Sequence, residues 1–228
     1  MNDIIRGKGE GVVFLFYGPP GCGKTLTAEA IADMLKRPLY QVSMGELGTT
    51  PGDLEKSLKN VLQMCEKWRA LVLLDEADSF VEQRSESSGI VRNSMVSVML
   101  KMIEYFQGVL FLTTNRVETF DPAFQTRITA AIKYDKLDVA SRTAVWRNLI
   151  ATSGHENCLK SKGGDVDVEV LGAYDLNGRS IKNALRLALS LAMAEAVERG
   201  GEQGEMLCHA PLIETVEMCV QFSKDMGV

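Results

Sequence analysis

The chain has 228 residues, 46% of them hydrophobic, which is enough to bury the core of one or two domains. Its formal net charge is −5, its isoelectric point is about 5.2, and no cluster of lysines and arginines occurs, which argues against a nucleic-acid-binding surface. Its apolar stretches are far shorter than the ~20 residues of a membrane span, and no signal peptide pattern opens the chain. Because the five cysteines are scattered without a CxxC pair, we expect free thiols in a reducing intracellular compartment, cytoplasm or nucleus.

Five short apolar runs alternate with helical patterns in the first part of the chain. Runs that are apolar throughout are typical of parallel strands with both faces covered. The helical pattern of Ile90–Phe106 repeats apolar residues every three or four positions. This alternation predicts an α/β fold with helices on both faces of a parallel sheet. The predicted strands are Val12–Tyr17, Leu39–Ser43, Leu71–Asp75, Val109–Thr114 and Ala130–Tyr134.

After the fifth run, the strand signal stops and only helical patterns follow. One helix is predicted over Ser141–Gly154, a long one from Arg179 to a pair of glycines, and a last one from about Pro211 to Ser223. Glycine is a frequent helix terminator, which supports these ends. The sequence therefore predicts two domains, an α/β domain over residues 1–138 and a small all-helical domain over residues 139–228.

A glycine-rich stretch lies between the first predicted strand and a helical pattern. It reads GPPGCGKT and matches the G-x-x-x-x-G-K-[ST] pattern of a phosphate-binding loop. Small residues let backbone N–H groups wrap a phosphate chain, and the helix N-terminus adds positive partial charge. Lys24 would reach the β- and γ-phosphates, and the Thr25 hydroxyl would be a ligand of Mg²⁺. The residues expected to contact ATP are Gly18, Pro19, Pro20, Gly21, Cys22, Gly23, Lys24, Thr25 and Leu26.

Two acidic residues come at the end of the third predicted strand. Asp75 ends the buried run LVLLD, where its carboxylate could join Thr25 in holding Mg²⁺. Glu76 follows, where a carboxylate can orient and deprotonate an attacking water. The alternative for Glu76 is a cap of the strand or an ion pair with a lysine. Next to a phosphate loop, the pair predicts nucleotide hydrolysis.

Three further polar residues could complete such a site. Asn115 follows the fourth predicted strand, where its amide can hydrogen-bond a phosphate or the attacking water, although asparagine also ends strands for turn reasons. Arg127 follows a short helix that Asp121 and Pro122 would begin. Its guanidinium could be structural, or it could neutralise charge on the nucleotide of a neighbouring subunit. Arg179 opens the long helix, where the helix dipole disfavours a cation, so a γ-phosphate contact and a solvated side chain are both open.

In this order and at these spacings, the motifs resemble the AAA+ ATPase module, and the resemblance covers nearly the whole chain. It implies a five-stranded parallel sheet, a helical lid, Mg-ATP, and assembly into a ring, commonly a hexamer. The stretches LFLTTNR and FDPAFQTRI also resemble a group of AAA-family ATPases of filamentous fungi. The roles implied are Walker A for Gly18–Thr25, Walker B for Asp75 and Glu76, sensor 1 for Asn115, arginine finger for Arg127 and sensor 2 for Arg179.

Three departures from the AAA pattern bear on function. The finger region of the family carries two arginines as R-x-G-R, whereas only Arg127 remains here, in a shortened segment. Members that thread polypeptides carry an aromatic residue after the second strand. Here SMGELGTTPGDLEKSL has none and Leu47 is a poor substitute, which argues against threading. Only 17 residues precede Gly18, where the family continues into an adenine-binding segment, which leaves open that the chain is a fragment.

Several functional interpretations follow. The main hypothesis is an ATPase that remodels a protein partner, and the missing aromatic favours a nucleotide-gated assembly module instead. A clamp-loader-like, DNA-acting ATPase fits the single TRI finger but not the acidic charge balance. A helicase interpretation of DEAD at Asp75–Asp78 is disfavoured by the single motor domain. The polar segment Val81–Ile90 could line a ring pore or be a solvated loop, and oxidation of Cys22 could block ATP.

Overall fold

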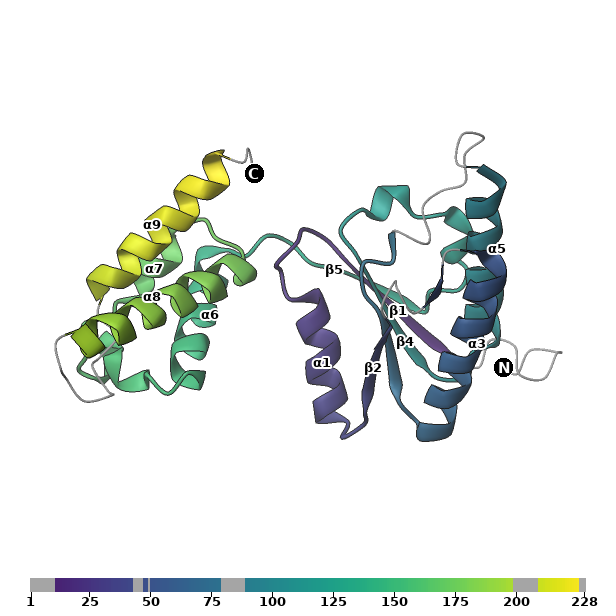
Figure 1. Ribbon diagram of the computed structural model, residues 1–228, viewed down its shortest axis with the longest axis horizontal. Coiled ribbons are helices and arrows are strands. Elements are labelled where there is room, and N and C mark those ends of the chain that lie inside the picture. The colour runs from purple at the N-terminus through teal and green to yellow at the C-terminus, as the bar shows by residue number, and fades with distance from the viewer. Residues whose placement is uncertain (1–10, 43–46, 49, 79–88, 199–208, 226–228) are drawn as a thin grey trace. The chain divides into compact units, whose positions relative to one another are not determined.

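The chain divides into two compact units, residues 1–135 and 136–228 (Figure 1). The first unit is an α/β domain, and the second is helical. No helix among the described residues is both long enough and apolar enough to cross a membrane. The computed structural model describes residues 11–42, 47–48, 50–78, 89–198 and 209–225.

The first unit is built on a five-stranded sheet in the order β2-β3-β4-β1-β5, and every strand pair is parallel. The register places Val12 of β1 beside Val109 of β4, and Leu74 of β3 beside Leu112 of β4. The predicted α/β fold with a parallel sheet is therefore confirmed. The strands are β1 Val12–Tyr17, β2 Leu39–Val42, β3 Leu71–Leu74, β4 Val109–Thr114 and β5 Ala130–Lys133.

Helices cover both faces of this sheet, with α1 on one face and α3 and α5 on the other (Figure 1). They span Lys24–Met34 (α1), Pro51–Trp68 (α3) and Gly89–Tyr105 (α5). Helix α3 has a capped start, because Pro51 occupies its first turn and the Thr50 side chain accepts a hydrogen bond from the Asp53 N–H. Two short 3-10 helices follow β4, η2 at Val117–Thr119 and η3 at Pro122–Phe124.

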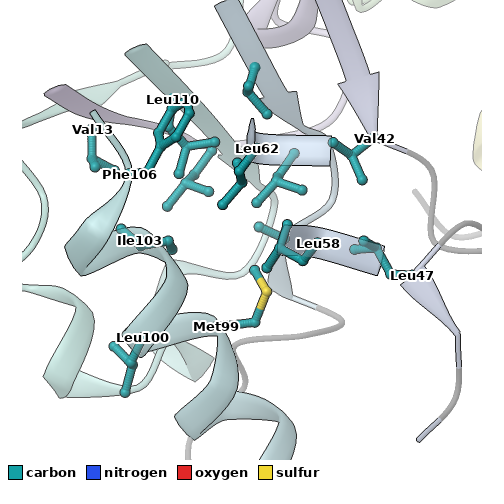
Figure 2. Close-up of a cluster of buried hydrophobic side chains, with 14 of the residues drawn as sticks. Val13, Val42, Leu47, Leu58, Leu62, Met99, Leu100, Ile103, Phe106 and Leu110 are labelled. Carbon is teal, nitrogen blue, oxygen red and sulfur yellow. The ribbon is translucent and has the colours of Figure 1, made fainter. Parts of the chain in front are cut away.

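The apolar strands supply two cores at once. Successive side chains of a strand point to opposite faces. Thus Val72 and Leu74 of β3 join the core under α3 and α5, while Leu71 and Leu73 join the core under α1. Figure 2 shows the larger core, where Met99 of α5 lies among leucines from the sheet and α3. Burial on both faces explains why these strands carry no polar alternation.

The second unit packs its helices around the fully buried Trp146. The buried Arg142 joins the start of this unit to a later segment of it, because its guanidinium donates to the carbonyl oxygens of Leu137 at 2.7 Å and Gly172 at 2.9 Å. Two 3-10 helices follow the first of these helices, α6 (Val139–Thr152): η4 (Glu156–Cys158) and η5 (Lys160–Lys162). The helices are α6 Val139–Thr152, α7 Val168–Ala173, α8 Gly178–Glu198 and α9 His209–Asp225.

Candidate functional site

The glycine-rich loop joins β1 to α1 in a conformation that glycine favours. Gly18, Gly21 and Gly23 have φ values of 141°, 75° and 96°, all in the left-handed region. Gly23 is the N-cap of α1, and no side chain caps this end of the helix. A Cβ atom at Gly23 would meet no heavy atom within 4 Å, so the space beside this backbone is open. Backbone N–H groups in such an arrangement can bind an anion.

Gly18 is required for a second, steric reason. A Cβ atom at this position would lie 2.0 Å from the carbonyl oxygen of Tyr134, which follows β5. The loop therefore leaves β1 in close contact with the backbone at the end of the neighbouring strand. Any side chain at residue 18 would push the loop away from β5.

The Lys24 side chain folds back into the loop. Its ammonium group donates hydrogen bonds to the carbonyl oxygens of Gly18 at 2.8 Å and Pro19 at 2.6 Å, and to Oδ1 of Asn115 at 2.8 Å. Lys24 is only 7% exposed, so a cation is held inside the loop. The contact with Asn115 brings two predicted site residues together although 91 positions separate them.

Asp75 collects several donors at the end of β3. The Thr25 hydroxyl lies 3.1 Å from each of its carboxylate oxygens, and the Thr113 hydroxyl donates to Oδ1. The Gln41 amide is more distant, at 3.4 Å from Oδ2. The predicted Mg²⁺ ligands, Thr25 and Asp75, are thus in contact. Their oxygen atoms are the ligands that Mg²⁺ prefers, so the residues present fit this ion.

Glu76 has an unusual backbone and an exposed side chain. Its φ is 53°, a left-handed conformation that few non-glycine residues adopt. The Glu76 N–H donates to Oγ1 of Thr113 at 3.0 Å, and the next N–H, of Ala77, donates to the Thr113 carbonyl oxygen at 2.8 Å. The carboxylate therefore extends from a backbone that β4 holds in place. Backbone strain of this kind is frequent at functional sites.

The strand order explains why these residues meet. Strands β3, β4 and β1 are neighbours in the sheet, and Asp75, Asn115 and the phosphate loop follow them in turn. Parallel strands end at the same edge, and ligands of open α/β sheets bind at that edge. The predicted Walker A, Walker B and sensor 1 residues thus lie together at the carboxyl edge of the sheet.

Arg127 makes its contacts within its own chain. Its Nη2 atom lies 3.0 Å from Oε2 of Glu104 in α5, and its Nη1 atom donates to the Ala123 carbonyl oxygen at 2.9 Å. The side chains of Arg127 and Glu104 are 26% and 24% exposed. As predicted, Asp121 caps the short helix before Arg127, here the 3-10 helix η3. The proposed reach of Arg127 to a neighbouring subunit stays a prediction, and in the structure this arginine is engaged by Glu104.

The remaining predictions concern other parts of the chain. Arg179 is exposed on the first turn of α8, and its role at a γ-phosphate stays a prediction. Leu47, considered as a substitute for the aromatic pore residue, is fully buried in the core shown in Figure 2. A fully buried side chain cannot grip a polypeptide. Residues 81–88 of the suggested pore segment lie outside the described residues.

Sequence reasoning did not identify Thr113, Glu104 and Gln41. Thr113 carried the clearest signal, because a threonine in an otherwise apolar strand has to find hydrogen-bond partners. Its partners depend on the register between β3 and β4, which the sequence alone does not give.

The chain is similar in sequence to known ATPases. A family model described as "ATPase family associated with various cellular activities (AAA)" matches residues 14–136. The chain is 26% identical over 200 residues to the Mitochondrial sorting homolog of Caenorhabditis elegans, covering 85% of this chain and 57% of that protein. It is 27% identical over 184 residues to the Proteasome-associated ATPase of Acidothermus cellulolyticus, covering 68% and 32%. It is 30% identical over 117 residues to the Cell division cycle protein 48 homolog of Archaeoglobus fulgidus, covering 49% and 16%. The chain therefore spans less than two thirds of the length of these relatives.

Proposed function

The chain belongs to the AAA family of ATPases, and from this premise we propose that it binds Mg-ATP at the phosphate loop, hydrolyses it, and uses the energy to remodel a protein partner. The contact of Lys24 with Asn115, next to the contact of Thr25 with Asp75, is the observation that carries the proposal. These contacts support the proposal because the Lys24 ammonium, the Asn115 amide and the oxygen atoms of Thr25 and Asp75 lie at one edge of the sheet.

Binding uses groups that the loop already presents. Its N–H groups and the uncapped start of α1 attract phosphate oxygens, and the Lys24 ammonium exchanges its carbonyl partners for the β- and γ-phosphates. Thr25 and Asp75 would hold Mg²⁺, which when bound would supply charge neutralisation at the phosphates. The fit of these oxygen donors to a hard cation supports this role.

Hydrolysis requires a base for the attacking water. Glu76 is exposed and follows Asp75 directly, so its carboxylate is suited to accept the proton of a water molecule. The water oxygen then bonds to the γ-phosphorus while the bond to the bridging oxygen of ADP breaks, which releases phosphate. Asn115, exposed at the end of β4, is suited to hold that water or the γ-phosphate by hydrogen bonds.

Assembly completes the proposed site. In a ring of identical subunits, commonly a hexamer in this family, Arg127 would stabilise the negative charge on a neighbour's nucleotide, an effect worth about 10³–10⁵ in rate. Arg127 would first have to leave Glu104, with which it pairs at 3.0 Å. Activity is therefore expected to rise with protein concentration.

Replacing Glu76 by glutamine tests the enzymatic part of the proposal. Because the amide keeps the shape but cannot take up a proton, ATP affinity should be unchanged while turnover falls by about 10²–10⁴. Calorimetric ATP binding and phosphate release are measured in parallel. Glu29→Gln on the exposed face of α1 serves as the control and should behave as wild type. Normal turnover in Glu76→Gln would refute the assignment.

One observation favours a nucleotide-gated assembly module instead. Leu47 is fully buried, so it cannot contact a threaded polypeptide. In such a module, ATP controls association and little mechanical work follows. Two measurements together separate the two functions. Light scattering after size exclusion gives the assembly state with ATP, with ADP and without nucleotide, and ATPase rates are measured in the presence of an unfolded protein. Stimulation by that protein supports remodelling, and nucleotide-dependent assembly without stimulation supports gating.

A further inference from the structure

We propose that Thr113 is a positioning residue for both acidic side chains of the hydrolytic site. Its hydroxyl orients Asp75, and the same hydroxyl holds the backbone from which Glu76 extends. The inference rests on the proposed function and adds a residue within β4 to a group of site residues that otherwise follow the ends of the strands. Thr113 is 1% exposed, so it acts through Asp75 and Glu76 and not by contact with a nucleotide.

The strand register brings Thr113 to this position. Leu112 of β4 pairs with Leu74, the last residue of β3, so Thr113 lies beside the turn that follows β3. Three consecutive residues of that turn bind it. Its hydroxyl donates to Asp75 Oδ1 and accepts the Glu76 N–H at 3.0 Å, and its carbonyl oxygen accepts the Ala77 N–H at 2.8 Å. One threonine thus connects the whole acidic turn to the neighbouring strand.

The contact with Asp75 matters for metal binding. Two hydroxyls donate to this carboxylate, from Thr25 and from Thr113. Thr25 is itself an expected metal ligand, and the Gln41 amide is 3.4 Å away. Thr113 is therefore the partner best placed to fix the direction of the carboxylate. Hydrogen-bond partners of metal ligands commonly change metal affinity or activity about 10–100-fold when they are removed.

The contact with Glu76 matters for the base. A left-handed conformation is unfavourable for a residue with a Cβ atom, so surrounding contacts must hold it. The Thr113 hydroxyl supplies the acceptor for the Glu76 N–H in that conformation. Without the acceptor, the turn can relax, and the backbone of Glu76 no longer holds the carboxylate in a fixed position.

A set of variants separates positioning from simple packing. Thr113→Val keeps the shape but removes both donor and acceptor, whereas Thr113→Ser keeps both. Thr114→Val is the matched control, because Thr114 is also 1% exposed in β4, but its hydroxyl binds Asp78 and the Arg116 N–H. Thr113→Cys, with a thiol that is a weak donor and acceptor, gives a graded variant in case the valine variant does not fold.

The readout is the binding of the fluorescent, non-hydrolysable analogue mant-AMPPNP, in EDTA and over a series of Mg²⁺ concentrations. Affinity in EDTA should be equal in all variants, because the phosphate loop is untouched. Mg²⁺ should increase the affinity for mant-AMPPNP, and the Mg²⁺ concentration that gives half of this increase should rise about 10–100-fold in Thr113→Val. It should rise less in Thr113→Cys and stay within about threefold of wild type in Thr113→Ser and Thr114→Val, and ATP turnover should follow the same order.

Two results would overturn the inference and leave the proposed function standing. One is an unchanged Mg²⁺ requirement in Thr113→Val. The other is an equal increase of the Mg²⁺ requirement in Thr114→Val, which would indicate general loosening of β4. If Thr113→Val does not fold, an unchanged Mg²⁺ requirement in Thr113→Cys has the same consequence. If wild-type protein fails to bind mant-AMPPNP even at saturating Mg²⁺, the proposed function fails, and the inference fails with it.

Discussion

Replacing Glu104 with glutamine is expected to raise the ATPase activity at a given protein concentration. The ion pair with Glu104 holds Arg127 in its own subunit, at 3.0 Å between Nη2 and Oε2, and two further bonds run to the Ala123 carbonyl oxygen and the Thr126 hydroxyl. If Arg127 completes a neighbour's site, these contacts must open first. Glutamine keeps an oxygen acceptor but removes the charge, so opening becomes easier.

The size of the effect follows from the kind of bond that is lost. A hydrogen bond to a charged group contributes about 1.5–3 kcal/mol and a neutral one about 0.5–1.5 kcal/mol. The difference, roughly 1–1.5 kcal/mol, is the contribution of the Glu104 charge to holding Arg127 in its own subunit. We apply this difference without reduction because both side chains are about three quarters buried. Since 1.4 kcal/mol is a factor of ten, the activity should rise about five- to tenfold. The free energy of unfolding should fall by about 1 kcal/mol, since the same bond stabilises the subunit.

The assay is the specific ATPase rate against protein concentration for wild type, Glu104→Gln and Arg127→Ala. Glu55→Gln is the control, because it breaks an exposed ion pair with Lys101, also on α5, that does not involve the finger. Glu104→Gln should reach its plateau at lower concentration, and Arg127→Ala should give a flat curve. A fall in activity in Glu104→Gln, or a wild-type rate independent of concentration, would show that the pair is a structural brace and that the finger role is wrong.

Two further predictions address the phosphate loop and the thiols. Gly18→Ala should lower the free energy of unfolding by about 1–3 kcal/mol, because its Cβ would lie 2.0 Å from the Tyr134 carbonyl oxygen. Gly23→Ala, where the space beside the backbone is open, should lower it by about 1 kcal/mol. Urea titrations without nucleotide measure both losses, and equal losses would contradict this difference. Burial, aided by the charge of Glu66, raises the pKa of Cys65 to about 11, so at pH 8 roughly one molecule in a thousand carries its reactive thiolate. Iodoacetamide followed by peptide mass spectrometry should therefore label the half-buried Cys22 before Cys65, and Mg-ADP should protect Cys22. Labelling of Cys65 before Cys22 would contradict the burial of Cys65.

Much of the fold was predictable because the sequence repeats two simple signals. Strands buried on both faces must be apolar throughout, and β1 and β4 coincide with their predicted runs. The phosphate loop was predictable because its chemistry needs glycine, lysine and threonine at fixed spacing. The contacts of Lys24 with Asn115 and of Thr25 with Asp75 follow once the strands lie parallel. Local pattern and sheet topology together were sufficient for this part of the site.

The contacts missed by sequence reasoning depend on details of packing. The pair of Arg127 and Glu104 joins residues 23 positions apart, in the turn after η3 and in α5, and no periodicity links them. Thr113 could be recognised as a buried hydroxyl, but its partners depend on the exact alignment of β3 and β4. Leu47 looked like a loop residue because glycines and threonines surround it, yet it fills the core beneath α3. The burial of Leu47 depends on the packing of α3 against the sheet, which a sequence pattern of this length does not predict.

The site contacts form a closed chain, which bears on how a nucleotide would be sensed. Lys24 binds Asn115, which is two residues from Thr113; Thr113 binds Asp75, and Asp75 binds Thr25, the neighbour of Lys24. Under the proposed function, a γ-phosphate that takes the Lys24 ammonium releases the Asn115 amide, while Thr113 still joins β4 to the acidic turn. Nucleotide binding would thus change one link and leave the others in place. Oδ1 of Asn115 would then be able to accept a hydrogen bond from the attacking water, which couples the positioning of water to the presence of the third phosphate.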